Sequence, residues 1–309
     1  MKQPNTFAKR AVNFGSDFGR KLSNNEFVVT VEVHPPRGYK LDNTLKSLEL
    51  LLDKVDVDAF NTTDIPLAQA RLSPIAMSVL LTEKFNKETI LHVANRYRNI
   101  LALQSDLLGA HALGIRNAFV FMGDPPEMGD VPTASSLSDV TSSELIKIVS
   151  GMNRGLGLSG NKLDDPTFFT VGCAINLEPE DIESEIESLK RKIDAGADFI
   201  LSQVTFSQNA VEKFANIMGD FPIPLVLGVL PLRSYKHAKF LDNAVPGMNV
   251  PNQILNRLEL AGPDGSEEGI IITQEILEAG RDLISGAYVV PAFGRYDDVA
   301  KVIGGLSMP

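Results

Sequence analysis

The chain has 309 residues, 44% of them hydrophobic, enough to bury the core of one large α/β domain or of two smaller ones. Its net charge of −10 disfavours non-specific binding to nucleic acid or to an anionic membrane surface. No apolar run is long enough for a transmembrane helix. The single cysteine, Cys173, excludes an internal disulfide and suits a reducing compartment. We therefore expect a cytoplasmic protein with no nucleic-acid partner and no membrane partner.

The first 26 residues have a character of their own. Lys and Arg outnumber Asp and Glu there, and the segment lacks the apolar stretch of a secretory signal. We expect these residues to form a native arm that packs against the domain. An organellar transit peptide is the alternative. The predicted division is an N-terminal arm at 1–26 and a catalytic domain at 27–309.

Strand-like and helix-like segments alternate along the rest of the chain. The predicted strands are 27–33, 57–61, 89–93, 116–122, 168–175, 198–203, 224–229 and 287–291. The predicted helices are 42–54, 71–85, 97–113, 143–154, 180–196, 208–218, 234–243, 269–284 and 295–304. Near-continuously apolar strands, each followed by a helix, predict a parallel sheet of the α/β class closed into a single-domain (β/α)8 TIM barrel. An open doubly wound sheet is the alternative.

Two connections are longer than the others. They cover 123–142, after the fourth predicted strand, and 244–268, after the seventh predicted helix. Long loops in a compact domain are often functional. We therefore expect both connections to have a functional role.

The first candidate site residue is Glu32. It falls near the end of the strand 27–33, directly before His34-Pro35-Pro36. A carboxylate between apolar walls loses water, which favours its protonated form near neutral pH, as a general acid requires. The alternative is a solvated glutamate on an exposed strand face.

Further polar residues follow the other strands, at the end where barrel enzymes carry their chemistry. Asp124, after Gly123, can accept hydrogen bonds from a ring amide and amine, or it can simply stabilise a turn before proline. Gln203 suits the edge of a heterocycle, unless it is a buried glutamine satisfied by backbone. His92 is a lone strand histidine, which is more often a core group than a catalyst.

Other signals are weaker. Arg96 and Arg98 have the forked guanidinium that suits phosphate, or they form salt bridges within a loop. The segment 155–160 matches a dinucleotide fingerprint in its letters, but it follows a helix, so we interpret it as a helix end and loop. The histidines lack metal-ligand spacing and one cysteine cannot build a zinc site, so no metal is expected.

Several short motifs together resemble the methylenetetrahydrofolate reductase family, over about residues 27 to 304. The matching segments follow the expected order: Val31-Glu32-Val33-His34-Pro35-Pro36-Arg37, Asn61-Thr62-Thr63-Asp64, Ala70-Arg71-Leu72-Ser73-Pro74, Arg96-Tyr97-Arg98-Asn99, Gly123-Asp124-Pro125-Pro126, Lys192-Ile193-Asp194-Ala195-Gly196-Ala197-Asp198, Ser202-Gln203, Gly228-Val229-Leu230-Pro231 and Pro291-Ala292-Phe293-Gly294-Arg295. Each segment alone is weak, and their collinear order carries the resemblance. The likeness is greatest to the short, single-domain bacterial type.

The resemblance implies an oxidoreductase of one-carbon metabolism and methionine biosynthesis. In such a flavoprotein, FAD binds at the barrel rim and is reduced by NADH, NADPH or another donor. Its hydride then converts 5,10-methylenetetrahydrofolate to 5-methyltetrahydrofolate. A folate substrate is the expected small-molecule partner, and Glu32 matches the acid that helps open the methylene bridge.

Further roles come from the same resemblance. Asp124 matches a catalytic carboxylate that contacts the pterin and tunes the flavin, and Gln203 matches an amide that reads the folate. The cofactor contacts it implies are Thr62, His92, Gly123, Asp124, Lys192 and Arg295, with Lys192 directed to the flavin phosphates. Met122 stands where many members have arginine, which removes one flavin contact. Tyr97 and Ser202 also depart from the common pattern.

Two other functions remain compatible with the sequence. One is a pterin-binding methyltransferase that passes a methyl group between folate and a corrinoid. The other is a folate-binding subunit of a larger reductase complex, whose partner carries the redox centres. A homo-oligomer or a redox partner subunit is accordingly expected among its partners.

Overall fold

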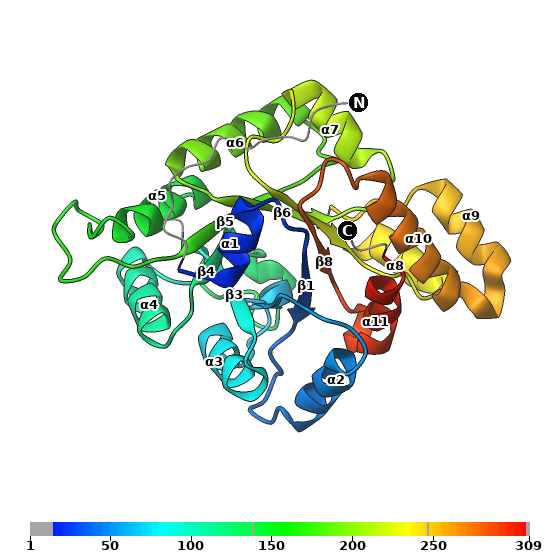
Figure 1. Cartoon of the computed structure of the whole chain (residues 1–309), viewed down its shortest axis with the longest axis horizontal. Helices are drawn as coiled ribbons and strands as arrows, with labels where there is room; N and C mark the ends of the chain where they lie inside the picture. The colour runs from blue at the N-terminus through cyan, green and yellow to red at the C-terminus, as the bar shows by residue number, and fades with distance from the viewer. Residues whose placement is uncertain (1–14, 138, 246, 307–309) are drawn as a thin grey trace.

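The computed structural model describes residues 15–137, 139–245 and 247–306. Eight parallel strands close into a barrel in chain order, and helices surround it (Figure 1). The predicted (β/α)8 TIM barrel is therefore confirmed, and the open doubly wound sheet is excluded. The strands are β1 (Val28–Val33), β2 (Ala59–Thr62), β3 (Glu88–Ala94), β4 (Asn117–Phe121), β5 (Thr170–Ile175), β6 (Phe199–Val204), β7 (Leu225–Val229) and β8 (Gly286–Val289).

The helices of the described residues include two that the sequence analysis missed. They are α1 (Asp17–Ser23), α2 (Asp42–Leu52), α3 (Pro74–Phe85), α4 (Ile100–Ala112), α5 (Ser142–Met152), α6 (Ile182–Ala195), α7 (Ala210–Met218), α8 (Tyr235–Ala244), α9 (Asn252–Ala261), α10 (Gly265–Ala279) and α11 (Tyr296–Gly304). Short 3₁₀ turns are η1 (Pro66–Ala68), η2 (Pro126–Met128), η3 (Gly262–Asp264) and η4 (Ala292–Gly294).

The prediction that 244–268 is a plain connection was wrong, because α9 lies within it. This helix buries Ile254, Leu255 and Leu258 and packs against α8 and α10, at the outer edge of the ring (Figure 1). The apolar spacing of those three residues was the available signal. In the described residues of the connection 123–142, the helical structure consists of the turn η2 and the first residue of α5.

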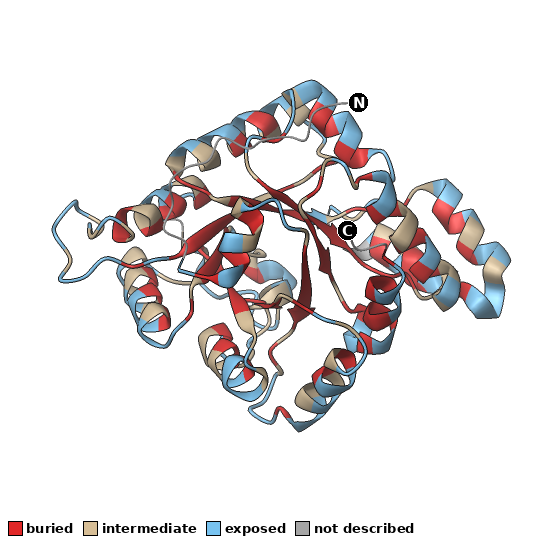
Figure 2. Ribbon diagram, viewed as in Figure 1, coloured by how far each residue is buried: buried red, intermediate tan, exposed pale blue. Residues whose placement is uncertain are grey.

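The alternation of side chains along each strand divides the core into two parts. Outward-facing residues such as Val31 and Val120 pack against the helices, which bury their inner faces and expose their outer ones (Figure 2). Inward-facing residues at the amino ends of the strands form a second apolar cluster inside the barrel. Its strand members are Val28, Ala59, Ile90, Phe119, Phe199, Leu201, Val226 and Tyr288.

Helix α1 closes the amino-terminal end of this barrel. Its Phe18 ring meets Phe199 edge to face at 5.2 Å between centroids, inside the second cluster. Glu88, which begins β3, accepts hydrogen bonds from the first amides of α1, those of Asp17 (2.7 Å) and Phe18 (3.0 Å). The described part of the arm thus packs against the barrel. Residues 1–14 lie outside the described residues, and the boundary at residue 26 stays a prediction.

Among the helices of the described residues, none is both long and apolar enough to cross a membrane.

We predict that Phe18→Ala destabilises the barrel by about 3 kcal/mol, because it removes a fully buried ring and leaves a cavity among rigid strands. Urea denaturation followed by circular dichroism measures this change. Leu260→Ala is the control, since Leu260 is 89% exposed on α9 and should change the unfolding midpoint very little. Equal midpoints for Phe18→Ala and wild type would show that α1 does not support the barrel.

Candidate active site

Four polar side chains face the barrel interior near the carboxyl ends of β1, β2 and β3. Glu32, Asn61 and His92 continue the inward-facing positions of their strands, and Thr63 follows β2 with the same alternation. All four residues, main chain included, are at most 7% exposed. The inward-facing positions are therefore apolar at the amino ends of the strands and polar at the carboxyl ends, where they form a polar layer beneath the barrel mouth.

Glu32 is buried in this layer. Its Oε1 lies 3.0 Å from His34 Nε2, and the hydroxyl of Tyr296 donates to its main-chain oxygen over 3.4 Å. Burial raises the pKa of Tyr296, and the charge of Glu32 raises it further, so the phenol stays neutral. The alternative of a solvated glutamate on an exposed strand face is excluded, whereas the role of general acid stays a prediction.

His34 links Glu32 to the neighbouring strand. Its Nδ1 lies 3.0 Å from Thr63 Oγ1, so both ring nitrogens have a hydrogen-bonding partner. Burial lowers the pKa of His34, but the charge of Glu32 and its hydrogen bond more than offset this effect. Arg71 opposes Glu32, and the net pKa of His34 is raised.

His92 lies deeper in the barrel. Its ring packs against Phe119 at 4.8 Å and Phe121 at 5.8 Å between centroids, and burial lowers its pKa to about 4. The imidazole is therefore neutral near pH 7. Its Nε2 lies 3.3 Å from Oδ1 of Asn61, whose Nδ2 is buried and makes no hydrogen bond within the described residues. This unpaired donor fits an acceptor atom of a bound ring.

Asp124 is held at the rim by the loop after β2. Its Oδ2 accepts from the amide of Leu67 over 2.7 Å, and its main-chain oxygen accepts from the Tyr97 hydroxyl over 2.5 Å. Leu67 has a left-handed φ of 56°, a strained conformation that the Asp124 carboxylate helps to stabilise. Burial, with the charge of Asp124, raises the pKa of Tyr97 to about 12. The carboxylate therefore ties two loops together at the mouth.

Gly123 lies under the same tyrosine. Its φ of +88° favours glycine, and a Cβ there would come within 3.2 Å of the Tyr97 ring. Tyr97 thus occupies the space beside the Gly123 backbone. Gln203 is exposed near the end of β6, after a shift in the register with β7, so the alternative of a buried glutamine is wrong.

Three residues predicted as cofactor contacts are engaged with groups of the protein itself. Thr62 is fully buried on the outer side of β2, where its hydroxyl lies 2.6 Å from that of Ser78 on α3. Lys192 donates to the main-chain oxygen of Ala174 over 2.8 Å, so its ammonium is engaged with β5. Arg295 lies 3.5 Å from Asp298 and lines a groove beside Lys54 and Lys301, between α2 and α11.

The residues predicted to hold FAD therefore do not form one cradle for it. Arg98 pairs with Asp64 and Asp106, as in the alternative interpretation, whereas Arg96 forms hydrogen bonds to the main-chain oxygen of Gly123 (3.1 Å) and to Ser136 (3.1 Å). Met122 is 55% exposed and uncharged. In these conformations the set of residues does not fit a flavin diphosphate.

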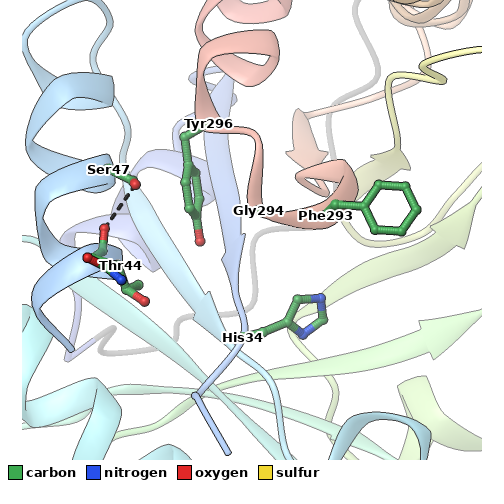
Figure 3. Close-up of a pocket in the computed structure, with 7 residues that line it drawn as sticks. His34, Thr44, Ser47, Phe293, Gly294 and Tyr296 are labelled. Atoms are coloured by element: carbon green, nitrogen blue, oxygen red, sulfur yellow. Dashed lines mark hydrogen bonds between the residues drawn. The ribbon is translucent and has the colours of Figure 1, made fainter. Parts of the chain in front are cut away.

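A cavity beside Glu32 brings in residues that the sequence analysis assigned no role. It has a volume of about 450 Å³ and lies between α2 and the loop after β8; its lining residues are His34, Asn43, Thr44, Ser47, Phe293, Gly294 and Tyr296. Figure 3 shows the His34 imidazole and the Phe293 ring extending to the same side, with Tyr296 beside α2. Phe293 is 72% exposed with a φ of 53°. The motif at 291–295 was the only sequence signal for the part that Phe293 has in this cavity. The backbone angle of Phe293 cannot be deduced from that motif.

Fold and site together define a (β/α)8 barrel with carboxylate, imidazole and amide groups gathered at its mouth. The family model for methylenetetrahydrofolate reductase matches residues 17–292, and the chain belongs to this family. "Methylenetetrahydrofolate reductase 2" of Saccharomyces cerevisiae is 25% identical over 268 residues, which cover 81% of this chain and 42% of that protein. "Probable methylenetetrahydrofolate reductase (NADPH)" of Caenorhabditis elegans is 22% identical, over 92% of this chain and 43% of that protein. The chain thus spans less than half the length of these relatives.

Solved structures support the fold. An uncharacterized protein from Clostridium thermocellum, described as binding two copies of 5-methyl-5,6,7,8-tetrahydrofolic acid, matches with a TM-score of 0.63 and 14% identity, over 93% of this chain and 96% of that one. A 2,3-dimethylmalate lyase matches with a TM-score of 0.52 and 13% identity, over 88% and 78% of the two chains. At such identities the likeness concerns the barrel alone.

We predict that Glu32→Gln lowers the pKa of His34, because burial and Arg71 remain while the attraction of the carboxylate is lost. In wild type the raised pKa means that protonation of His34 stabilises the fold at low pH, and that this contribution disappears as pH rises through the His34 value. An NMR titration of the imidazoles measures the shift. His111, on α4, is the control and should titrate identically in both proteins; an unchanged His34 would disprove the pairing.

Proposed function

We propose that this chain reduces 5,10-methylenetetrahydrofolate to 5-methyltetrahydrofolate. The observation that carries the proposal is the buried carboxyl group of Glu32, beside an imidazole, at the mouth of a barrel of this family. Binding of a methylated folate by the Clostridium thermocellum protein, which shares the fold, adds support. The activity is a proposal because the chain spans only part of the length of its curated relatives.

The proposed chemistry needs one proton and one hydride. Glu32 donates its proton to the bridging nitrogen of the folate, the bond from that nitrogen to the methylene carbon breaks, and an iminium ion forms. A hydride then adds to the methylene carbon and gives the methyl group. Burial of Glu32 excludes the water that would compete for its proton.

Substrate recognition is assigned to polar groups around the rim. Asp124 and Gln203 have the acceptors and donors that the edge of a pterin requires, and Asn61 offers its unpaired Nδ2. Phe293 offers an exposed ring to an aromatic part of the substrate. These roles deepen the sequence prediction by adding Asn61 and Phe293.

The hydride donor proposed is a reduced nicotinamide. Relatives of this chain are named for NADPH and for NADH, in Caenorhabditis elegans and in Arabidopsis thaliana. FAD, which the sequence predicts as the intermediate carrier, stays a prediction, and so does the cytoplasmic location.

A second candidate function is that of a folate-binding subunit whose redox centre belongs to a partner. The observation in its favour is the engagement of Lys192, Arg96 and Arg98 with groups of the protein itself, together with the uncharged Met122. Reduction of folate by the purified chain with a nicotinamide donor alone would exclude this function.

We predict that Glu32→Gln lowers the rate of folate reduction by at least about 100-fold, because glutamine cannot donate the proton. Binding of 5-methyltetrahydrofolate, followed by calorimetry, should change little, since glutamine has nearly the same shape. Glu259→Gln, a change on α9 far from the mouth, is the matched control and should keep full activity. An active Glu32→Gln enzyme would rule out Glu32 as the acid.

We predict that the purified protein retains less than one flavin per chain, and that Met122→Arg raises this ratio. The guanidinium would give the rim a cation free to meet a phosphate group. The visible absorption of oxidised flavin, divided by the protein concentration, measures both. Met128→Arg, a change on the turn η2, is the control for an added charge in the same loop. A full complement of flavin in wild type would contradict the misfit described above.

A further inference from the structure

We propose that His34 is a positioning residue that returns a proton from solvent to Glu32 after each turnover. This inference rests on the proposed function, in which Glu32 is the acid. It assigns to His34 a role that neither the sequence motifs nor the comparisons provide.

The first argument is the geometry of the hydrogen-bonded chain. Residues 32 and 34 are two apart, so their side chains lie on the same face of the extended backbone after β1. Glu32 Oε1 lies 3.0 Å from His34 Nε2, and His34 Nδ1 lies 3.0 Å from Thr63 Oγ1. A hydroxyl can donate or accept, so Thr63 suits both the neutral and the protonated imidazole. The ring can therefore give its Nε2 proton to Glu32 while Nδ1 keeps its own proton beside Thr63, and it turns over before Nε2 takes a new proton from solvent.

The second argument is the gradient of exposure. The side chain of Glu32 is 10% exposed and that of His34 is 40% exposed. His34 lines the cavity of about 450 Å³ between α2 and the loop after β8, whereas Glu32 is not among the lining residues (Figure 3). His34 thus lies between the buried acid and the space that water can enter.

The third argument is the charge around the ring. Glu32 favours the imidazolium ion, and Arg71, from the segment between β2 and α3, disfavours it. His92 of β3 is neutral near pH 7, and Tyr296 of α11, which faces Glu32, is a neutral phenol. Neither of these two groups therefore competes for the proton. Among the described residues, Glu32 is the group that stabilises the imidazolium of His34. The proton donor of the transfer is therefore His34, and the acceptor is Glu32.

The proposed step balances as a simple proton transfer. When the carbon–nitrogen bond of the folate breaks, Glu32 loses its proton to the nitrogen and becomes a carboxylate. The imidazolium of His34 then gives its Nε2 proton to Glu32. The neutral imidazole keeps its Nδ1 proton; once the ring has turned over, its bare Nε2 takes a proton from solvent, so that the cycle consumes one solvent proton per turnover.

The experiment compares the pH dependence of folate reduction in wild type and in His34→Gln. Glutamine can still hydrogen-bond to Glu32 but cannot carry a proton. We expect at least about a tenfold loss of kcat that grows as pH rises, with little change in KM. Added imidazole, small enough to enter the cavity, should restore a large part of the lost rate. His111→Gln is the matched control and should behave as wild type.

Three results would each decide against the proposal. A wild-type rate and pH profile in His34→Gln would overturn it. So would an equal loss at every pH without rescue by imidazole, because His34 would then only hold Glu32 in place. An NMR titration in which Glu32→Gln leaves the His34 pKa unchanged would remove the coupling, independently of activity. Absence of folate reduction in wild type would instead overturn the proposed function.

Discussion

The polar layer at the barrel mouth depends on the closed ring of strand hydrogen bonds. Closure gives each strand an inside and an outside, and the period of two then sends every second side chain into the interior. At the amino ends those side chains are apolar and meet Phe18 of α1, which seals that end. At the carboxyl ends of β1 to β3 the same positions carry Glu32, Asn61 and His92. The same alternation of side chains thus provides the apolar packing at one end of the barrel and the polar candidate site at the other.

Burial gives the residues of this layer their chemical character. His92 is neutral because it has lost water and packs against phenylalanine rings, whereas His34, near the surface, is biased toward its charged form by Glu32. The pKa values of these two histidines are therefore shifted in opposite directions. The loops add rigidity, since Asp124 and Asp64 connect the segments after β2, β3 and β4.

The sequence placed the candidate residues correctly along the strands, but it did not show which way each side chain faces. Glu32, Asp124 and Gln203 all lie near the ends of the strands to which the sequence assigned them. Thr62 and Thr63 are adjacent and chemically alike, yet only Thr63 faces the mouth, because the strand alternation separates them. Lys192 is long enough to reach several places, and it reaches the Ala174 carbonyl. The sequence pattern does not show which of these positions the Lys192 ammonium group reaches.

The sequence by itself determined the class of fold, the order of the strands and the family, because apolar periodicity and collinear motifs are local properties of the chain. It did not reveal α9, whose short apolar stripe is surrounded by proline, glycine and asparagine. Only the tertiary structure decided that His34 meets both Glu32 and Thr63, that Tyr97 covers Gly123, and that Phe293 stands exposed beside the cavity. The physical reason is that these contacts join strands and loops far apart in the chain, and barrel closure sets their distances.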